Sequence, residues 1–283
     1  MRVLIPLPER AQGPLRNLRC PPVGSGATRR RCYRPTAHSP APAPPQSRVT
    51  GCTQGGPIGS RLMQQTIAVP QRDLRPLLAL MATAAAAVFA WLAVSTECGY
   101  SPAVYDPAVT AWAVRARHGL VTAVAWPVTQ LGGTLGLTLL TAAVCTFLLL
   151  RRHWRRALVL AGAMVGSSLL TVILKLIFAR ARPSTALLLG DPASSWSFPS
   201  GHSFNTGVFV GVLAGFALVS TASPARKALA GIAACMAAAA VGLSRVYLAY
   251  HWLTDVLAGW AIALVWLCVV GIVSLTVLGP RQE

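Results

Sequence analysis

Beyond Arg75, long apolar segments alternate with short polar connections almost to the end of the chain. Each segment is close to the ~20 residues that an α-helix needs to cross the hydrocarbon core of a bilayer. The pattern predicts an all-α fold, an integral membrane bundle of six transmembrane helices. A further apolar stretch, Leu120–Gln130, contains Pro127 and either extends the second span or lies in the membrane interface. The six predicted spans are Leu77–Ser95, Leu131–Leu150, Ala157–Phe178, Phe204–Thr221, Ala228–Tyr247 and Thr254–Leu278.

The composition agrees with a membrane protein. Hydrophobic residues make up 54% of the chain and charged residues only 11%, with a mean hydropathy of +0.56. A soluble globular protein carries roughly 25% charged residues. The composition therefore disfavours a soluble domain.

The first 62 residues differ from the rest. They contain eleven prolines and ten arginines against one glutamate, and carry half of the formal net charge of +18. Because such a segment lacks the apolar residues for a core, we predict a disordered leader over 1–62 and a membrane domain over 63–283. Two interpretations stay open: a translated leader, or a stretch upstream of a true start at Met63. With one aromatic residue, Tyr33, the segment is not expected to bind nucleic acid.

The basic residues in short connections predict the orientation in the membrane. With six spans, the basic leader and the basic groups after the second, fourth and sixth spans all fall on one side. Such a bias marks the cytoplasmic side, so we predict a multi-pass protein of the cell membrane with both termini in the cytoplasm. The basic residues after these spans are Arg151, Arg152, Arg155, Arg156, Arg226, Lys227 and Arg281.

Four cations near the ends of the spans run against this orientation. Lys175, Arg180, Arg182 and Arg245 fall at or near the outer ends of the third and fifth spans. Charge near membrane depth is costly unless it has a partner or a function, although any one of them alone could be a snorkelling anchor. The other reactive side chains gather on the same outer side, which favours a function for the set. The outer segments that hold them are Lys175–Pro183, Pro199–His202 and Ser244–Asp255.

Lys175 and Arg182 are seven residues apart, about two helical turns, so a continuing helix would place them on one face. We expect them to clamp a phosphate, Arg through paired hydrogen bonds and Lys as a point charge. Arg180 would point away from this face, in an interfacial role. Pro183 would end the span near Arg182.

Ser200 and Gly201 directly precede the fourth span. A helix N-terminus offers free N–H groups and a partial positive charge, which favour a bound anion. Gly201 would let the backbone approach that anion closely. The alternative for Ser200 is a helix cap with no further role.

His251 and Asp255 are four residues apart and would share a helical face, so the carboxylate can accept a hydrogen bond from the imidazole. This bond would fix the tautomer and stabilise the charge that develops if the ring attacks; the alternative is a purely structural pair. Arg245 and His251 are six apart and would not share a face. Their spacing predicts a break in the helix between Tyr247 and Trp252.

These groups suit phosphoryl transfer through a covalent intermediate. Lys175, Arg182 and Arg245 would neutralise the non-bridging oxygens. His251 would attack, and His202 would protonate the leaving oxygen and then deprotonate the water that frees phosphate. The outer side offers too few carboxylate and histidine ligands for a metal, so we expect neither a metal nor a cofactor.

The three segments resemble the motifs of the type 2 phosphatidic acid phosphatase (PAP2)/haloperoxidase superfamily, K-x6-RP, PSGH and SR-x5-H-x3-D, with every position satisfied. The resemblance implies a six-helix membrane phosphatase over 63–283 and does not extend to the leader. It implies three catalytic residues, His251, His202 and Asp255. It implies substrate binding by Lys175, Arg182, Ser200, Gly201 and Arg245.

The activity implied by the resemblance is that of a lipid phosphate phosphatase at the outer leaflet. Phosphatidate, phosphatidylglycerophosphate and a polyprenyl diphosphate are candidate substrates, and the connection Ser184–Phe198 is expected to set specificity. One alternative is a phosphotransferase that passes the phosphoryl group or headgroup to an alcohol. The six spans disfavour a soluble haloperoxidase, and the intact motifs disfavour a non-catalytic binding or transport protein. The oligomeric state stays open.

Overall fold

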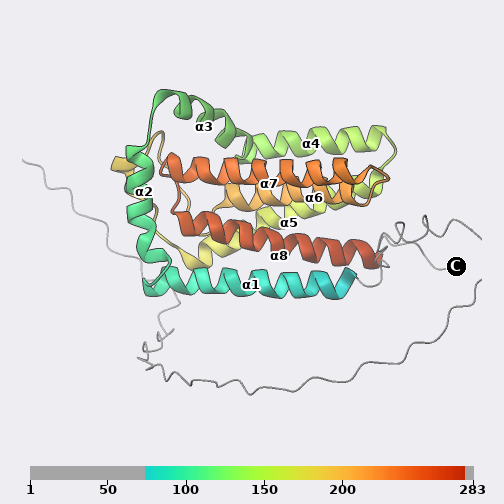
Figure 1. Ribbon diagram of the computed structural model, residues 1–283, viewed down its shortest axis with the longest axis horizontal. Coiled ribbons are helices and arrows are strands. Elements are labelled where there is room, and N and C mark those ends of the chain that lie inside the picture. Colours follow the sequence, from blue (N-terminus) through green and yellow to red (C-terminus); the bar gives the residue numbers. More distant parts are fainter. Residues whose placement is uncertain (1–73, 278–283) are drawn as a thin grey trace, which may run out of the picture. The chain divides into compact units, whose positions relative to one another are not determined.

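The computed structural model describes residues 74–277, and these residues form helices and irregular connections without strands, as Figure 1 shows. The predicted all-α fold is confirmed over this range. The predicted leader, Met63 and Arg281 lie outside the described residues. The helices are α1 Leu74–Cys98, α2 Asp106–Arg115, α3 Gly119–Leu131, α4 Thr134–Leu150, α5 Trp154–Phe178, α6 Gly201–Leu218, α7 Pro224–Tyr247 and α8 Leu253–Val277, with 3₁₀ turns at Ala103–Tyr105 and Thr185–Leu187.

Five helices, α1, α5, α6, α7 and α8, are long and apolar enough to cross a membrane, and they correspond to five of the six predicted spans. The remaining span is a bent pair, because α3 and α4 meet at 58°. The bend makes Leu120–Gln130 part of a helix of its own. It also brings the carbonyl of Gln130 against Gly136, where any Cβ atom would collide with that oxygen.

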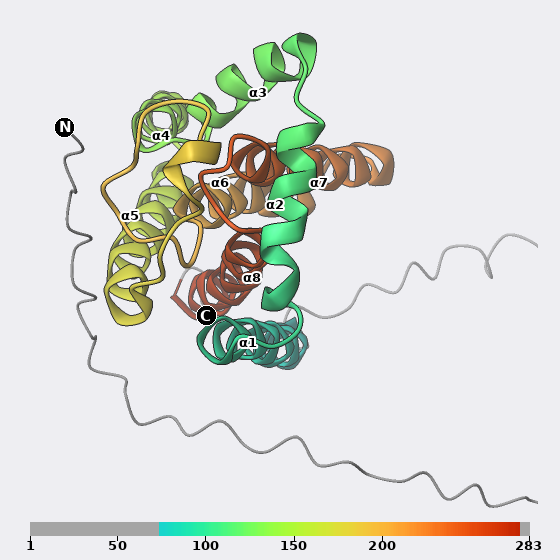
Figure 2. The ribbon, with the colours of Figure 1, turned by 90° about the vertical axis from the view of Figure 1, so that its left-hand side faces the viewer.

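Helix α6 occupies the centre of the bundle and packs against α5, α7 and α8, while α1 lies along α8, as Figure 2 shows. Its side chains Phe204 and Val208 are fully buried in the main core cluster with Leu160. Small residues bring the helices close: a Cβ atom on Gly207 would lie 3.0 Å from Ala263. Such small contacts are how membrane helices approach one another closely.

The C-terminal ends of α5 and α7 and the N-terminal ends of α6 and α8 meet at one end of the bundle, the end that α2 crosses (Figures 1 and 2). The three outer segments predicted from the sequence are therefore brought together. The predicted break between Tyr247 and Trp252 is confirmed, since α7 ends at Tyr247 and α8 begins at Leu253.

Candidate active site

A cavity of about 810 Å³ opens at this end of the bundle. Six of the eight predicted site residues line it, and Ser200 and Asp255 are fully buried outside its lining. The residues that line it are Lys175, Arg182, Gly201, His202, Arg245 and His251.

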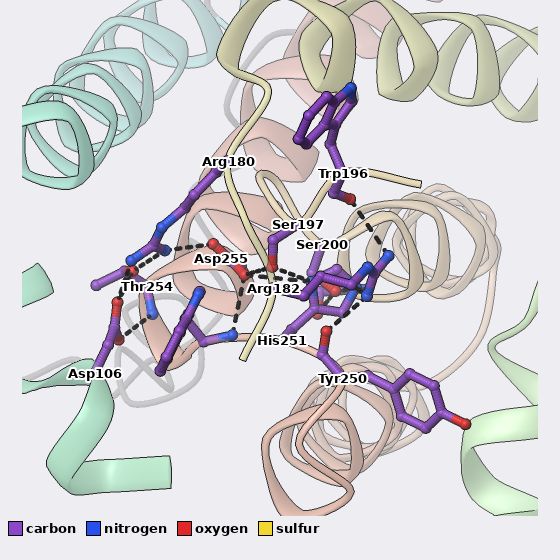
Figure 3. A network of polar contacts seen from close by, with 12 residues as sticks. Asp106, Arg180, Arg182, Trp196, Ser197, Ser200, Tyr250, His251, Thr254 and Asp255 are labelled. Atoms are coloured by element: carbon purple, nitrogen blue, oxygen red, sulfur yellow. Dashed lines mark hydrogen bonds and ion pairs between the residues drawn. The ribbon is translucent and has the colours of Figure 1, made fainter. Parts of the chain in front are cut away.

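His251 and Asp255 form the predicted pair, with 3.3 Å between Nδ1 and Oδ2. The prediction that the two residues share a helical face is wrong, because His251 precedes the first residue of α8 and Asp255 lies in the first turn of that helix. The Asp255 carboxylate instead accepts the backbone N–H of Trp252 at 3.0 Å and so caps the helix. It also accepts a hydrogen bond from the hydroxyl of Ser197, a contact shown in Figure 3.

Burial and positive neighbours keep the His251 ring neutral. The residue is 2% exposed, and this burial, followed by the charges of Arg182, Lys175 and Arg245, holds the pKa of His251 well below its ordinary value. Because Asp255 accepts a hydrogen bond from Nδ1, the lone pair is left on Nε2. That atom lies 3.4 Å from Nη1 of Arg182, so the ring nitrogen with the lone pair and a cation lie side by side.

Arg180 does not point away from the site, as the helical spacing suggested. Its guanidinium lies between two carboxylates, 2.8 Å from Oδ2 of Asp106 and 2.5 Å from Oδ1 of Asp255 (Figure 3). It also donates to the hydroxyl of Thr254 at 2.8 Å. The expectation failed because it assumed a continuing helix, whereas α5 ends at Phe178.

Asp106 was missed by the sequence reasoning. It lies at the start of α2, is 2% exposed, and accepts hydrogen bonds from the backbone N–H and hydroxyl of Thr254. The signal was present, since Asp106 is an acidic residue on the same predicted side as Arg180, a cation for which no carboxylate partner was predicted. Ser197 offered no such signal within its serine-rich stretch.

Lys175 and Arg182 both line the cavity, but not from one helical face. Ala179 ends α5 in the left-handed region, with φ of 42°, and Arg182 lies in the connection that follows. Arg182 donates to the carbonyl oxygens of Ser195 at 2.7 Å and Tyr250 at 2.6 Å. Lys175 donates to the carbonyl oxygen of Trp196. The clamp is thus held by the backbone of two connections.

Arg245 lies in the last turn of α7 and is 6% exposed. Its Nη1 donates to the hydroxyl of Thr129 at 2.8 Å, and its guanidinium lies 3.9 Å from the ring centroid of Tyr250. Its Nε has no hydrogen-bond partner among the described residues. The hydrogen bond to Thr129 and the contact with the Tyr250 ring therefore orient the cation at the edge of the cavity.

At the start of α6, the structure supports the helix-cap interpretation of Ser200. The hydroxyl of Ser200 accepts the N–H of Ser203 at 3.4 Å, and its own N–H donates to the carbonyl oxygen of Asp255 at 3.0 Å. Ser200 thus caps α6, and a direct contact with substrate stays a prediction. Gly201 packs tightly, since a Cβ atom there would lie 3.0 Å from Cγ2 of Thr171. His202 occupies the first turn and faces the cavity.

Three cations, Lys175, Arg182 and Arg245, line the cavity together with His251. Between Leu74 and Val277 no three histidine, cysteine, aspartate or glutamate side chains are grouped so as to hold a metal ion. The carboxylate nearest the reacting groups, Asp255, has its oxygens bound to Arg180, Ser197 and Trp252. The arrangement of donors suits an anion such as phosphate.

Comparison with known proteins gives consistent matches. Residues 156–276, which contain all three motif segments, match the family model of the PAP2 superfamily. The chain is 33% identical over 160 residues to phosphatidylglycerophosphatase B of Bacillus subtilis, covering 56% of this chain and 78% of that protein. The crystal structure of a transmembrane PAP2 type phosphatidylglycerolphosphate phosphatase from Bacillus subtilis is similar with a TM-score of 0.61 and 29% identity, covering 70% of this chain and 98% of the other. The protein described here therefore belongs to the PAP2 superfamily.

Proposed function

We propose that this protein is a membrane lipid phosphate phosphatase that works through a phosphohistidine intermediate on His251. The observation that carries the proposal is the buried, neutral ring of His251, with Nδ1 held by Asp255 and Nε2 in a cation-lined cavity. A neutral imidazole among fixed cations is arranged to attack an anionic phosphate. The similarity to enzymes named for phosphatidylglycerophosphate supports a lipid substrate.

In the first step, Nε2 of His251 attacks phosphorus, and the bond from phosphorus to the lipid oxygen breaks. The leaving oxygen takes a proton from His202. Water then gives a proton to His202 and attacks phosphorus, which breaks the bond to nitrogen and releases inorganic phosphate. Asp255 stabilises the positive charge of the ring during attack.

The remaining site residues would bind the phosphate. Lys175, Arg182 and Arg245 neutralise the non-bridging oxygens while charge redistributes. Gly201 and Ser200 bring the N-terminus of α6 against the same group, where its unpaired N–H groups favour an anion.

The connection Ser184–Phe198 is the proposed specificity element. Ser195 lines the cavity, and the carbonyl oxygens of Ser195 and Trp196 accept hydrogen bonds from the clamp residues. This position supports contact with the headgroup. The candidate substrates are phosphatidate, phosphatidylglycerophosphate and a polyprenyl diphosphate.

Hydrolysis is expected to survive removal of divalent metals, because Lys175, Arg182 and Arg245 supply the positive charge that metal ions provide elsewhere. The measurement is phosphate release by the detergent-purified protein from these three lipids, before and after treatment with EDTA. The control is EDTA saturated with magnesium. Loss of activity that a divalent cation restores would contradict metal independence.

Failure to release phosphate from any of the three lipids would contradict the proposed phosphatase. Transfer of the phosphate to an added alcohol, in place of release, would instead make the protein a phosphotransferase.

The active site is proposed to face outward from the cell membrane, with both termini in the cytoplasm. Four basic residues lie in and around the turn between α4 and α5, at the end of α5 opposite Lys175: Arg151, Arg152, Arg155 and Arg156. Their charge favours the cytoplasmic side.

This orientation predicts that a cysteine placed at the exposed Ser194, beside the cavity, reacts with a membrane-impermeant maleimide in intact cells. The matched control is Arg152→Cys, which should react only after lysis. Both are scored as labelling above that of the unchanged protein. The reverse pattern would overturn the orientation.

A further inference from the structure

Ser197 lies beside the proposed nucleophile and is fully buried, with an exposed fraction of 0%. Its hydroxyl donates a hydrogen bond to Oδ2 of Asp255. The same hydroxyl oxygen lies 3.4 Å from Nδ1 of His251, the ring nitrogen that is 3.3 Å from that carboxylate oxygen. One serine therefore contacts both members of the histidine–aspartate pair (Figure 3).

The two contacts use different parts of the hydroxyl group. A serine hydroxyl has one hydrogen to donate and two lone pairs to accept, whereas an ionised carboxylate only accepts. The hydrogen of Ser197 therefore points to Asp255. The N–H at Nδ1 of His251 is then shared between the carboxylate and a lone pair of the serine. An apolar side chain at this position would leave the ring with the carboxylate alone.

The backbone around Ser197 is held from both sides. Its N–H donates to the carbonyl oxygen of Arg180 at 2.8 Å. The next residue, Phe198, is also 0% exposed, and its ring centroid lies 4.9 Å from that of Phe178 and 5.7 Å from that of Phe89. Aromatic rings at such separations pack favourably. The hydroxyl is thus placed by packed neighbours, as a residue that orients a reacting group requires.

Ser197 also helps to set which way the Asp255 carboxylate faces. Arg180 holds Oδ1 at 2.5 Å, and Oδ2 is the oxygen that faces the His251 ring. Besides the ring, Oδ2 accepts hydrogen bonds from two neutral donors, the Ser197 hydroxyl and the backbone N–H of Trp252. Loss of the hydroxyl would leave one of these two donors, so the carboxylate would be held less firmly against the ring.

We propose that Ser197 is a positioning residue for His251, which acts on the ring directly and through Asp255. The proposal rests on the phosphatase function proposed above. When Nε2 bonds to phosphorus, the bond from phosphorus to the lipid oxygen breaks, and that oxygen takes its proton from His202. The ring becomes cationic and keeps its proton on Nδ1. Ser197 and Asp255 then stabilise the charge through hydrogen bonds to that N–H, and the serine keeps its own proton.

This role separates turnover from lipid binding. Ser197 does not line the cavity, whereas Lys175, Arg182 and Arg245 do. The hydrogen bonds that hold these three cations go to other residues. Removal of the Ser197 hydroxyl should therefore lower kcat and leave KM for the lipid unchanged.

Ser197→Ala tests this role through phosphate release from whichever of the three candidate lipids the wild type hydrolyses fastest. We expect kcat to fall roughly tenfold or more, because the charged transition state loses a hydrogen bond. KM should stay within about twofold of wild type. Ser197→Thr returns a hydroxyl and should recover most of kcat. If its methyl group does not fit, Ser197→Cys, whose thiol is a weak donor, should give an intermediate kcat.

Single-turnover rates separate this role from a loss of folded protein. With radiolabelled lipid phosphate and an alkaline quench, Ser197→Ala should form labelled protein more slowly than wild type. The label should then be lost at the wild-type rate or faster, since the cationic intermediate is less well stabilised. Partial unfolding would instead lower the amount of label and leave both rates unchanged.

The matched control is Ser95→Ala. Ser95 is also 0% exposed, and its hydroxyl donates to the carbonyl oxygen of Leu92 within α1 at 2.7 Å. Its kcat should stay within about threefold of wild type. Equal losses in both alanine variants, a change confined to KM, or wild-type single-turnover rates in Ser197→Ala would overturn the role of Ser197 and leave the phosphatase standing. Wild-type protein inactive on every lipid would remove both proposals.

Discussion

His251→Ala is expected to abolish phosphate release, with a fall in kcat of roughly 10⁴-fold or more. The variant removes the nitrogen proposed to attack phosphorus. Of the two side chains beside the ring, Arg182 is a cation that lies 3.4 Å from Nε2, and Asp255 is fully buried, so neither can replace that nitrogen. Water would then have to attack directly, with the cations still in place. Any residual phosphate release would measure how much Lys175, Arg182 and Arg245 accelerate the direct attack of water.

The measurement is phosphate release by wild type and variant at saturating lipid. Because His251 is a buried side chain, thermal unfolding in detergent must show that the variant keeps its fold. His251→Gln, which retains more of the side-chain volume, serves as a second inactive variant. A folded His251→Ala protein that turns over like the wild type would refute the covalent mechanism.

The intermediate itself can be trapped. Wild-type protein quenched in alkali with radiolabelled phosphatidylglycerophosphate should carry label that acid removes, as expected for a phosphorus–nitrogen bond. His251→Ala should carry none. Label that persists in this variant would place the intermediate on another residue.

Arg180→Met is expected to lower kcat by roughly 10²-fold, although Arg180 does not line the cavity. The guanidinium lies between Asp106 and Asp255, and the Asp255 side chain is 0% exposed. Without the cation, two buried carboxylates lose their charged partner, which typically destabilises a protein by about 3–5 kcal/mol. Asp255 would then take up a proton or turn from the ring, and the His251 ring would lose the charge that supports attack.

Arg180 is thus proposed as a positioning residue that acts through Asp255. This role predicts how kcat and KM should change in the variant. The fall should appear in kcat with KM for the lipid nearly unchanged, since the clamp residues are intact. The measurement is a full kinetic series at a temperature where thermal unfolding shows the variant folded. Arg180→Lys should recover part of kcat because a cation returns. Arg182→Met is the contrasting variant, where KM should rise because a phosphate contact is lost.

Asp106→Asn makes a milder version of the same test. It keeps the shape of the side chain and one acceptor for the backbone N–H of Thr254, but it removes the charge and replaces the acceptor that faces Arg180 by a donor. A smaller loss in kcat than in Arg180→Met is expected. A folded Arg180→Met protein with kcat within about threefold of wild type would show that the Asp106–Arg180 link is only structural, because a catalytic contribution through Asp255 would exceed that.

The amino-acid sequence by itself determined the elements that depend on neighbours along the chain. Continuous apolar runs specify spans because the bilayer core admits only backbone that satisfies its own hydrogen bonds. Five of the six spans appear as single helices, with ends displaced by a few residues. The residue types of the site were also readable, since phosphate chemistry needs clustered cations and a paired histidine, and the motif spacing brings them to one side.

Only the tertiary structure decided the partners across the bundle. Arg180 and Asp106 are 74 residues apart, and Arg245 and Thr129 are 116 apart. Their contact depends on the path of the connection that follows α5, on the crossing of α2 over the helix ends and on the bend between α3 and α4. No local pattern of apolar and polar residues specifies these three features. The cavity at this end of the bundle has the same origin. Hydrophobic periodicity records which side of a helix is apolar, whereas a cavity forms only where several helices fail to close against one another.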